Sequence, residues 1–380
     1  MSGPLAGVRV LEFAGLGPVP FAAMLLADLG AQVVRVDRAH GSPAMDLVAA
    51  MTRSRPSITI DLKHPEAITV VRELIADSDI LLEGFRPGVM ERLGLGPREC
   101  LAAHPGLVYG RMTGWGQDGP WAARAGHDIT YAAITGALHL CGPAGKPMAP
   151  VNLLADFAGG SMPLVIGVLA ALRVRDTTGQ GQVVDAAMVD GAAYLATMFY
   201  EMHAAGEWRD QRGVNLLDGG LPCYDTYECA DGRWVAVGAL EPQFWAQLNE
   251  ILGVRFARGQ YDPQGYAEQR AAYERVFRTR TRDEWAAIFE GSDACVAPVL
   301  SLAEAPEHPH LRARGSFADL AGRAQPRVAP RFSVSTPPTP TPPRPAGADT
   351  LATLRARGID ADRIAALLAA GVIAQTDQPA

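Results

Sequence analysis

The N-terminal part of the chain alternates between short apolar runs and a helical stretch, and this order constrains the fold more than any other feature. Residues 8–13 are rich in β-forming side chains, and a loop of glycine and proline follows at 14–20. Residues 21–29 have a helical pattern that ends at a glycine, and a second apolar run covers 31–36. Strand, glycine loop, helix and strand in this order predict a βαβ unit and therefore a parallel sheet.

The same alternation continues through the first half of the chain. Further strands are predicted at 57–60, 80–83, 107–112 and 182–185, and helices at 65–76, 88–93, 128–138, 157–173 and 188–203. We therefore expect an α/β protein whose large domain is Rossmann-like and contains an open parallel sheet.

A second, smaller domain is indicated by a change of pattern near residue 190. Alternating runs at 224–228 and 234–237 flank Asp231-Gly232, a strong turn signal, and predict a β-hairpin. Helical patterns follow at 242–252, 266–278 and 281–290. This mixture of a hairpin and helices is typical of an α+β domain.

The domain boundaries follow from these patterns. We expect a discontinuous large domain made of residues 1–189 and 311–380, with the small α+β domain at 190–310. A proline-rich segment at 336–345, TPPTPTPPRP, lies in the large domain and is expected to be extended.

The composition narrows the class of protein. The chain has 380 residues, 48% of them hydrophobic and 20% charged, which is typical of a globular protein and excludes a disordered one. Its net charge of −7 argues against nucleic acid as a partner, which would require a basic face.

No signal peptide or membrane span is visible, so no membrane association is expected. The five cysteines form no C-x-x-C pair, so we expect no metal site and a cytoplasmic location.

The glycine loop is the first candidate site. Gly15-Leu16-Gly17 follows a strand and opens a helix, and Asp37 lies where a dinucleotide fingerprint places its acidic ribose partner. The third glycine of that fingerprint is replaced by Pro20, and Pro18 removes a backbone N–H that would face a pyrophosphate. The pattern is weak evidence for a dinucleotide site, and a tight turn between strand and helix is the favoured explanation.

Four basic residues form the second candidate site. Arg38, Lys63, Arg86 and Arg92 lie in or near the segments that follow predicted strands. The carboxyl ends of parallel strands share one edge of a sheet, where ligands bind, so these cations would suit a ligand with several phosphates. A solvated surface that carries basic residues by chance remains the alternative.

Three residues could transfer or orient a proton. His127 precedes a helical pattern, and the backbone N–H groups at a helix start can hold a negative oxygen. Asp156 also precedes a predicted helix, and Gly159-Gly160 would let a ligand approach the backbone. A loop histidine, an N-capping aspartate and, at Glu241, an ordinary helix-start glutamate are the alternatives.

Six long segments of the chain match one known family. They are LLEGFRPGVMERLGLGP (81–97), RMTGWGQDGPWAARAGHDITY (111–131), NLLADFAGGSM (152–162), GQGQVVDAAMVDG (179–191), YDTYECADGRWVAVGALEPQFW (224–245) and GIDADRIAALLAAGVI (358–373). In these segments the chain resembles the family III CoA-transferase superfamily (CaiB/BaiF-like). His127 in AGHD and Glu241 in GALEPQFW make it similar to the α-methylacyl-CoA racemase branch.

The resemblance implies a reaction and its residues. A racemase of this branch interconverts the two C2 epimers of a 2-methyl-branched acyl-CoA by moving one proton through an enolate. His127 and Asp156 would face opposite sides of C2 and exchange the roles of base and acid. Backbone N–H groups near Asp128 would hold the enolate oxygen, and Glu241 would orient His127.

The resemblance also implies where the substrate binds. The expected CoA-binding residues are Arg38, Ile60, Asp61, Leu62, Lys63, Gly84, Phe85, Arg86, Arg92, Gly126, His127, Asp128, Ile129, Thr130 and Tyr131. Met188, Met198, Met202 and Tyr224 are candidates for an acyl surface, because methionine adapts to varied shapes, although methionines on a buried helix explain the pattern as well. The family forms an interlocked homodimer and needs neither a metal nor a separate cofactor.

Two other functions remain open for a chain of this kind. A family III CoA-transferase would use Asp156 as a nucleophile that forms a mixed anhydride with the acyl group. A binding module would hold a CoA ester on the same basic edge without proton chemistry. The pair of His127 and Glu241 favours the racemase, because transfer through an anhydride requires no histidine base.

Overall fold

Two compact units make up the chain. The computed structural model describes residues 3–38 and 49–376. The first unit contains Met1–Thr135, Val151–Leu195 and Phe317–Ala380, and the second contains Gly136–Pro150 and Ala196–Ser316. The chain therefore leaves the first unit and returns to it twice, at residues 136–150 and 196–316, whereas the sequence predicted a single departure at 190–310.

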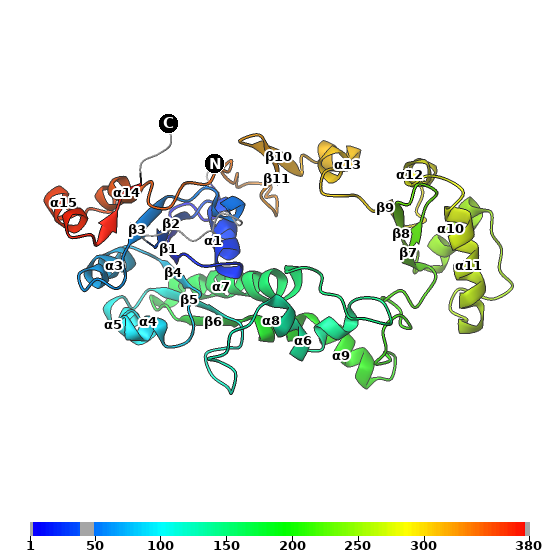
Figure 1. The fold of residues 1–380 in the computed structure, drawn as a ribbon, viewed down its shortest axis with the longest axis horizontal. Helices are drawn as coiled ribbons and strands as arrows, with labels where there is room; N and C mark the ends of the chain where they lie inside the picture. The colour runs from blue at the N-terminus through cyan, green and yellow to red at the C-terminus, as the bar shows by residue number, and fades with distance from the viewer. Residues whose placement is uncertain (1–2, 39–48, 377–380) are drawn as a thin grey trace. The chain divides into compact units, whose positions relative to one another are not determined.

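A seven-stranded sheet forms the centre of the first unit (Figure 1). Its strands, in spatial order, are β12 (Ile373–Ala374), β3 (Ser57–Ile60), β2 (Gln32–Asp37), β1 (Arg9–Phe13), β4 (Ile80–Glu83), β5 (Val108–Thr113) and β6 (Val183–Ala187). All neighbouring pairs are parallel except β12 with β3. The predicted α/β class with a parallel sheet is confirmed.

Helices cover this sheet, and its strands β3, β4 and β5 are buried on both faces. Every residue of β3, β4 and β5 is buried, which is typical of parallel strands that are covered on both sides. Among the residues that the structure describes, the first unit contains the α-helices α1 (Pro18–Asp28), α3 (Ala67–Ala76), α4 (Val89–Arg92), α5 (Pro97–Ala103), α6 (Asp128–Ile134), α7 (Met162–Thr178), α8 (Met188–Leu195), α14 (Thr350–Ala356) and α15 (Ala361–Ala369). A short antiparallel pair, β10 (Phe317–Leu320) and β11 (Arg323–Pro326), lies apart from the main sheet.

Three predicted helices have different bounds in the structure. The stretch predicted at 157–173 is a π-helix over Leu153–Ser161 followed by α7. The single helix predicted at 188–203 is two helices, α8 and α9 (Thr197–Ala204), because Ala196 departs from helical geometry between them. The helix predicted at 128–138 ends at Ile134, since Gly136 has a positive φ of 71°.

Arg35 and Arg55 make buried ion pairs on the sheet. The Nη1 atom of Arg55 lies 3.4 Å from the Oε2 atom of Glu12, and both side chains have no exposed surface. Arg35 donates to Asp37 over 2.6 Å. Burial raises the pKa of the Glu12 carboxyl to about 7, although the nearby Arg55 and Arg35 lower it.

The second unit is a small α+β body. Its sheet is β7 (Tyr224–Glu228), β8 (Trp234–Gly238) and β9 (Val296–Pro298), and its helices include α10 (Pro242–Leu252), α11 (Tyr266–Phe277), α12 (Arg282–Phe289) and α13 (Pro309–Ala313). The predicted hairpin is confirmed, with Tyr224 paired to Gly238 and Glu228 to Trp234. Aromatic side chains fill the core, where Tyr227 stacks on Phe277 and Trp285 meets the edge of Phe277.

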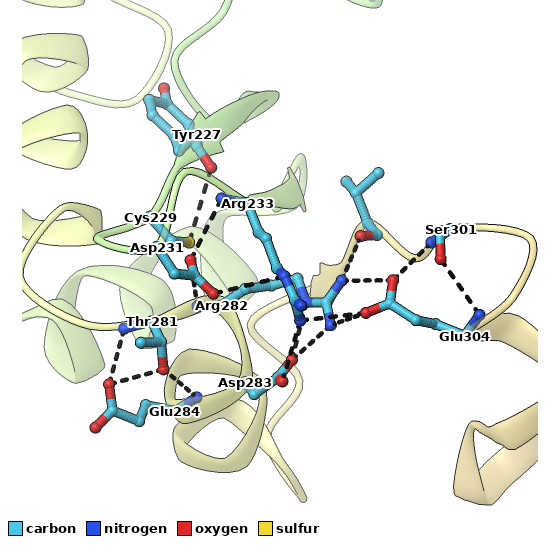
Figure 2. A network of polar contacts seen from close by, with 11 residues as sticks. Tyr227, Cys229, Asp231, Arg233, Thr281, Arg282, Asp283, Glu284, Ser301 and Glu304 are labelled. Atoms are coloured by element: carbon cyan, nitrogen blue, oxygen red, sulfur yellow. Dashed lines mark hydrogen bonds and ion pairs between the residues drawn. The ribbon is translucent and has the colours of Figure 1, made fainter.

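A network of polar contacts ties the segment after β9 to this body (Figure 2). The guanidinium of Arg282 donates to both carboxylate oxygens of Glu304 over 3.0 and 2.8 Å and to the Val299 carbonyl over 3.0 Å. Glu304 also accepts from the Ser301 N–H over 2.8 Å. The Arg282 side chain is only 4% exposed, so the network holds a charged group that is almost fully out of water.

One stretch of the described residues, Leu153–Thr178, is long and apolar enough to cross a membrane by length and composition. It comprises the π-helix and α7, and α7 packs against β5 and β6 in the first unit. A core helix of this kind passes the same test, so the stretch is weak evidence for a membrane span.

We predict that Arg282→Ala destabilises the protein, because it leaves Glu304 and the Val299 carbonyl without their buried partner. The midpoint of thermal unfolding should fall by about 5 °C. The matched control is Arg312→Ala, which removes an arginine from a pair with Glu307 that is exposed on both sides. Differential scanning calorimetry should show almost no shift for the control, and equal shifts for both variants would contradict the prediction.

Candidate active site

A large cavity lies at the carboxyl edge of the parallel sheet in the first unit. Its volume is about 860 Å³, and it is lined by the segments that follow β1, β2, β4, β5 and β6. Ligands of open α/β sheets bind at this edge. Of the residues predicted from the sequence, the lining includes Arg38, Gly84, Phe85, Arg86, Gly126, His127, Tyr131, Asp156 and Met188. The cavity therefore collects two of the four predicted basic residues, together with His127 and Asp156.

The π-helix places Asp156, and glycines allow it to lie where it does. A Cβ atom on Gly159 would come within 2.7 Å of the Ala192 nitrogen, and one on Gly191 within 1.7 Å of the Gly159 carbonyl oxygen. The π-helix and α8 thus touch through their backbones. The expectation that Gly159-Gly160 leaves room for a ligand is wrong, because α8 fills that space, with Met188 against Gly160. Asp156 lies inside the π-helix, so it is not an N-cap.

The carboxylate of Asp128 connects the His127 segment to the π-helix. Its Oδ2 atom accepts hydrogen bonds from the backbone N–H of Ala155 over 2.7 Å and of Asp156 over 2.8 Å. The Asp128 residue is 5% exposed and does not line the cavity. Its side chain therefore has no access to a substrate in the cavity, and it holds together the two segments that carry His127 and Asp156.

The surroundings of Asp156 favour its protonated form. Burial raises the pKa of its carboxyl, the hydrogen bond from Asn152 Nδ2 lowers it, and the negative Asp128 raises it further, against a lowering effect of His127. The Asn152 bond is 3.3 Å long. A carboxyl whose pKa is raised toward neutrality can both accept and return a proton.

His127 and Tyr131 are placed by the start of α6. Thr130 Oγ1 accepts from the His127 N–H over 2.9 Å and fixes the first turn. The ring of Tyr131 lies against Gly114 and Gly126, where a Cβ atom would come within 2.2 and 2.5 Å of it. Burial, and then the charge of Asp156, raise the pKa of Tyr131 to about 12. His127 is exposed on the cavity wall next to this rigid ring.

Five arginines line the cavity: Arg35, Arg38, Arg86, Arg124 and Arg344. Of these, only Arg38 and Arg86 were predicted from the sequence. Arg35 had a signal as the one charged residue within the apolar run 31–36, and Arg344 as the only charged residue of the proline-rich segment. Arg124 lies over the ring of Trp121, with its guanidinium carbon 4.5 Å from the ring centre.

The proline-rich segment reaches the cavity through its last residues. Its Thr341 exchanges hydrogen bonds with Ser54, one of 3.0 Å and one of 2.9 Å. Arg344 pairs with Asp349, and its carbonyl accepts from Arg35 over 3.4 Å. Residues 343–346 form part of the cavity wall. The segment has no helix or strand, and these contacts fasten it to Arg35 of β2 and to Ser54, which precedes β3.

Other residues predicted to bind CoA lie outside the cavity lining. Ile60 is buried at the end of β3, the Asp61 N–H donates to the Val372 carbonyl, and Leu62 packs on the core. Lys63, Arg92, Ile129 and Thr130 are exposed. Of these, Lys63 comes after the carboxyl end of β3, at the same edge of the sheet as Arg38, while Arg92 is the last residue of α4. The structure therefore does not bring this second group onto the cavity wall.

The glycine loop borders Asp156. Gly17 has a φ of 71°, and a Cβ atom there would lie 3.2 Å from the Asp156 Oδ2 atom. Asp37, the predicted ribose partner, has its Oδ2 atom occupied by Arg35 and by the Ser57 hydroxyl at 2.6 and 2.5 Å. The loop is thus a turn whose glycine makes room for a carboxylate, in agreement with the turn interpretation.

Four of the predicted residues belong to the second unit: Met198, Met202, Tyr224 and Glu241. Glu241 is exposed and directly precedes α10. Its carboxylate has no hydrogen-bond or ion-pair partner among the residues that the structure describes. The preceding Leu240 is fixed by a 2.8 Å hydrogen bond from Gln260 to its carbonyl and by another from Tyr261. Glu241 thus stands on a braced loop with a free carboxylate.

Within residues 3–38 and 49–376, no group of three His, Cys, Asp or Glu side chains is close enough to hold a metal ion. The cavity offers arginines, one histidine and two carboxylates, Asp37 and Asp156. Such a lining suits an anionic ligand and a proton transfer beside it.

Comparison with known proteins identifies the family. The model of CoA-transferase family III matches residues 5–350, and the chain belongs to this family. It is 44% identical to the alpha-methylacyl-CoA racemase of Mus musculus over 366 residues, which cover 95% of each chain. It is 46% identical to the racemase of the same name from Homo sapiens over 341 residues, 89% of this chain and 88% of the human protein. The crystal structure of a CaiB/BaiF family protein from Brucella suis has the same fold, with a TM-score of 0.83 at 26% identity over 94% of this chain and 100% of that one.

We predict that Asp156→Asn stabilises the protein at pH 7. Because the pKa of folded Asp156 is raised, this group stabilises the fold at low pH, and that contribution is lost as the pH rises. A neutral asparagine avoids the loss, so the unfolding midpoint should rise by about 2 °C at pH 7, and the difference should shrink toward pH 4.

The control for this prediction is Asp118→Asn, at an exposed position. Thermal unfolding at pH 7 and pH 4 should give no pH-dependent difference between this control and the wild type. A lower midpoint for Asp156→Asn at pH 7 would show that the ionised carboxylate stabilises the fold.

Proposed function

We propose that this protein is an α-methylacyl-CoA racemase that interconverts the (2R) and (2S) epimers of 2-methylacyl-CoA thioesters. The observation that carries the proposal is the meeting of His127 and Asp156 in one arginine-lined cavity. The 44% and 46% identity to proteins named alpha-methylacyl-CoA racemase supports it. The arrangement supplies two proton-transferring groups and cations for the phosphates of CoA.

The reaction moves one proton between the two faces of C2. One group of the pair removes the C2 proton, and the electrons of the C–H bond pass into an enolate whose charge rests on the thioester oxygen. The other group returns a proton to the opposite face, and the roles exchange in the reverse direction. The raised pKa of Asp156 brings its proton affinity closer to that of an imidazole, which suits such an exchange.

The enolate needs a partner for its negative oxygen. Backbone N–H groups at the start of α6, beside His127 and Asp128, would donate to it. Tyr131 and the glycines around it keep this segment rigid, so the donors need not reorganise during the reaction. No step of this mechanism requires a separate cofactor.

The cavity lining offers two kinds of surface, one for the anionic part of the substrate and one for its apolar part. Arg38, Arg86 and Arg124 line the cavity and are exposed, so they can pair with the phosphates of CoA. Met188 and Met112 line it as well and offer an adaptable surface to an acyl chain that moves when C2 inverts. Met198, Met202 and Tyr224, the other residues predicted for an acyl surface, belong to the second unit.

We further propose that the active protein is an interlocked homodimer in which Glu241 of the partner subunit orients His127. Glu241 has a free carboxylate on a braced loop, as a residue that reaches a second chain requires. The first unit also exposes large apolar side chains, such as Ile166 at 67%, Leu153 at 57% and Ile134 at 54%. Exposed apolar residues in such numbers indicate a surface that another chain covers.

The cysteines support a cytoplasmic location. All five are free thiols, and Cys100, Cys223 and Cys229 are buried. Free thiols are typical of a reducing compartment. We therefore propose that the protein acts in the cytoplasm.

The racemase reaction predicts exchange at C2. When the protein is incubated in D₂O with one epimer of a 2-methylacyl-CoA, NMR should show deuterium at C2 together with the other epimer. His127→Ala and Asp156→Ala should each slow this exchange by at least about 100-fold, because each removes one of the two proton carriers. His310→Ala changes an exposed histidine of α13 and should exchange like the wild type.

Other outcomes would point to the alternatives. If C2 keeps its proton while CoA passes to an added carboxylic acid, the protein is a transferase. If the thioester binds and neither reaction occurs, the protein is a binding module. Either result contradicts the proposed reaction.

If each active site takes His127 from one subunit and Glu241 from the other, two chains that are inactive alone should complement each other. Co-expressed His127→Ala and Glu241→Ala chains should recover about a quarter of the wild-type activity, since half of the dimers are mixed and each mixed dimer has one intact site. Co-expressed His127→Ala and Asp156→Ala chains are the control. Both lesions lie in the first unit, so no intact site can form. Equal activity of the two mixtures would rule out a site shared in this way.

A further inference from the structure

The contacts of the Asp128 carboxylate give this side chain a task beyond the helix that it begins. Asp128 is the direct neighbour of His127 in the chain, and its Oδ2 atom accepts from the N–H groups of Ala155 and of Asp156 itself. We propose that Asp128 is a positioning residue whose carboxylate holds Asp156 and His127 in a fixed relation across the cavity. This inference rests on the proposed function, in which those two residues exchange the proton.

The form of the π-helix makes this contact effective. Residues at the start of any helix have backbone N–H groups without partners inside the helix, and a π-helix bonds each N–H five residues back. The helix begins at Leu153, so the N–H groups of Ala155 and Asp156 are among those left open. Asp128 satisfies both of them with one oxygen, at 2.7 and 2.8 Å. The backbone of the reacting aspartate is therefore bonded directly to the segment that carries the histidine.

Other contacts hold the π-helix but do not reach His127. Gly159 and Gly191 fix it against α8, and Ser161 donates to the Pro18 carbonyl over 2.7 Å. These contacts set the position of the helix in the unit. The Asp128 contact acts at the turn that carries Asp156, where a shift of about 1 Å is enough to cost about 100-fold in rate.

The charge of Asp128 acts on the same carboxyl. It raises the pKa of Asp156, after the larger effect of burial, while His127 and the hydrogen bond from Asn152 lower it. Tyr131 of α6 also faces Asp156, with Arg86 near that tyrosine. The neighbouring elements contribute no charge at their contacts with the π-helix, which are made by Gly17 before α1 and by Gly191 and Ala192 of α8. The charge of Asp190, also on α8, raises the pKa of Asp185. Of these neighbouring groups, Asp128 is the one whose negative charge raises the pKa of Asp156.

The test is Asp128→Asn, which keeps the size of the side chain, turns the two charge-assisted hydrogen bonds into weaker neutral ones, and places an amide Nδ2 where the buried Oδ1 has no hydrogen-bond partner among the described residues. We expect kcat for C2 exchange to fall by about 100-fold while KM changes by less than about 3-fold, since the variant disturbs the reacting groups and not the binding surface. The pKa of the Asp156 carboxyl, followed by ¹³C NMR and assigned with Asp156→Asn, should shift downward. In the direction that uses Asp156 as the base, the ascending limb of the pH–rate profile should move to lower pH.

The matched control is Asp360→Asn. Asp360 also accepts two backbone N–H groups at a helix start, from Asp362 over 2.8 Å and from Arg363 over 3.3 Å. It lies before α15, away from the cavity lining. This variant should leave kcat and the Asp156 titration unchanged, so a loss seen in both variants would indicate a merely structural effect and overturn the proposal.

The remaining outcomes are also decisive. An Asp128→Asn enzyme with wild-type kcat and an unchanged Asp156 titration overturns the proposal. If that variant does not fold, Asp128→Ser offers a smaller acceptor, and failure of both to fold assigns Asp128 to stability alone. If the wild type does not exchange the C2 proton at all, the proposed function fails, whereas the NMR titration still decides whether Asp128 controls Asp156.

Discussion

The arrangement of the site depends on two hydrogen bonds from backbone N–H groups to the Asp128 carboxylate. They join the loop after β5, which carries His127, to the π-helix that carries Asp156. In the chain, residues 136–150, which belong to the second unit, separate α6 from this π-helix. Neither segment belongs to the sheet, so the sheet alone does not fix their relation. A buried carboxylate that accepts two N–H groups is a strong and directional contact, which makes it suited to set this distance.

Beneath the cavity the sheet carries charges where parallel strands usually carry apolar residues. Glu12 on β1, Arg35 on β2 and Glu83 on β4 are all buried, and Arg111 on β5 bonds to Glu83 over 2.8 Å. Removing such groups from water is costly, and each is balanced by a partner of opposite charge. Arg35 lies on the cavity wall and also donates to the Arg344 carbonyl, so this charged layer also helps to hold the proline-rich segment at the cavity.

The sheet could be predicted because its signals are local. Runs such as 80–83 and 107–112 are mostly apolar, as is typical of parallel strands buried on both faces, and the structure has strands at these places. Helix ends were less predictable. Residues 153–161 are mostly apolar with no break before α7, and nothing in the sequence indicated that Gly159 and Gly191 would let α8 lie against the backbone of a π-helix there. A contact between two segments more than 30 residues apart leaves no periodic pattern in either one.

The sequence by itself determined the α/β class, the hairpin, the family and the presence of His127, Asp156 and Glu241 in family motifs. The basic residues at the sheet edge were also visible, because Arg38 and Arg86 follow strands whose carboxyl ends must share one edge. The tertiary structure decided which residues meet: it brought Arg124 and Arg344 to the cavity, left Lys63 and Arg92 off its wall, and turned Asp128 inward to the backbone of Asp156. The physical reason is that local patterns fix the elements, whereas the approach of two distant segments depends on close backbone contacts and buried hydrogen bonds, which exist only once the chain is folded.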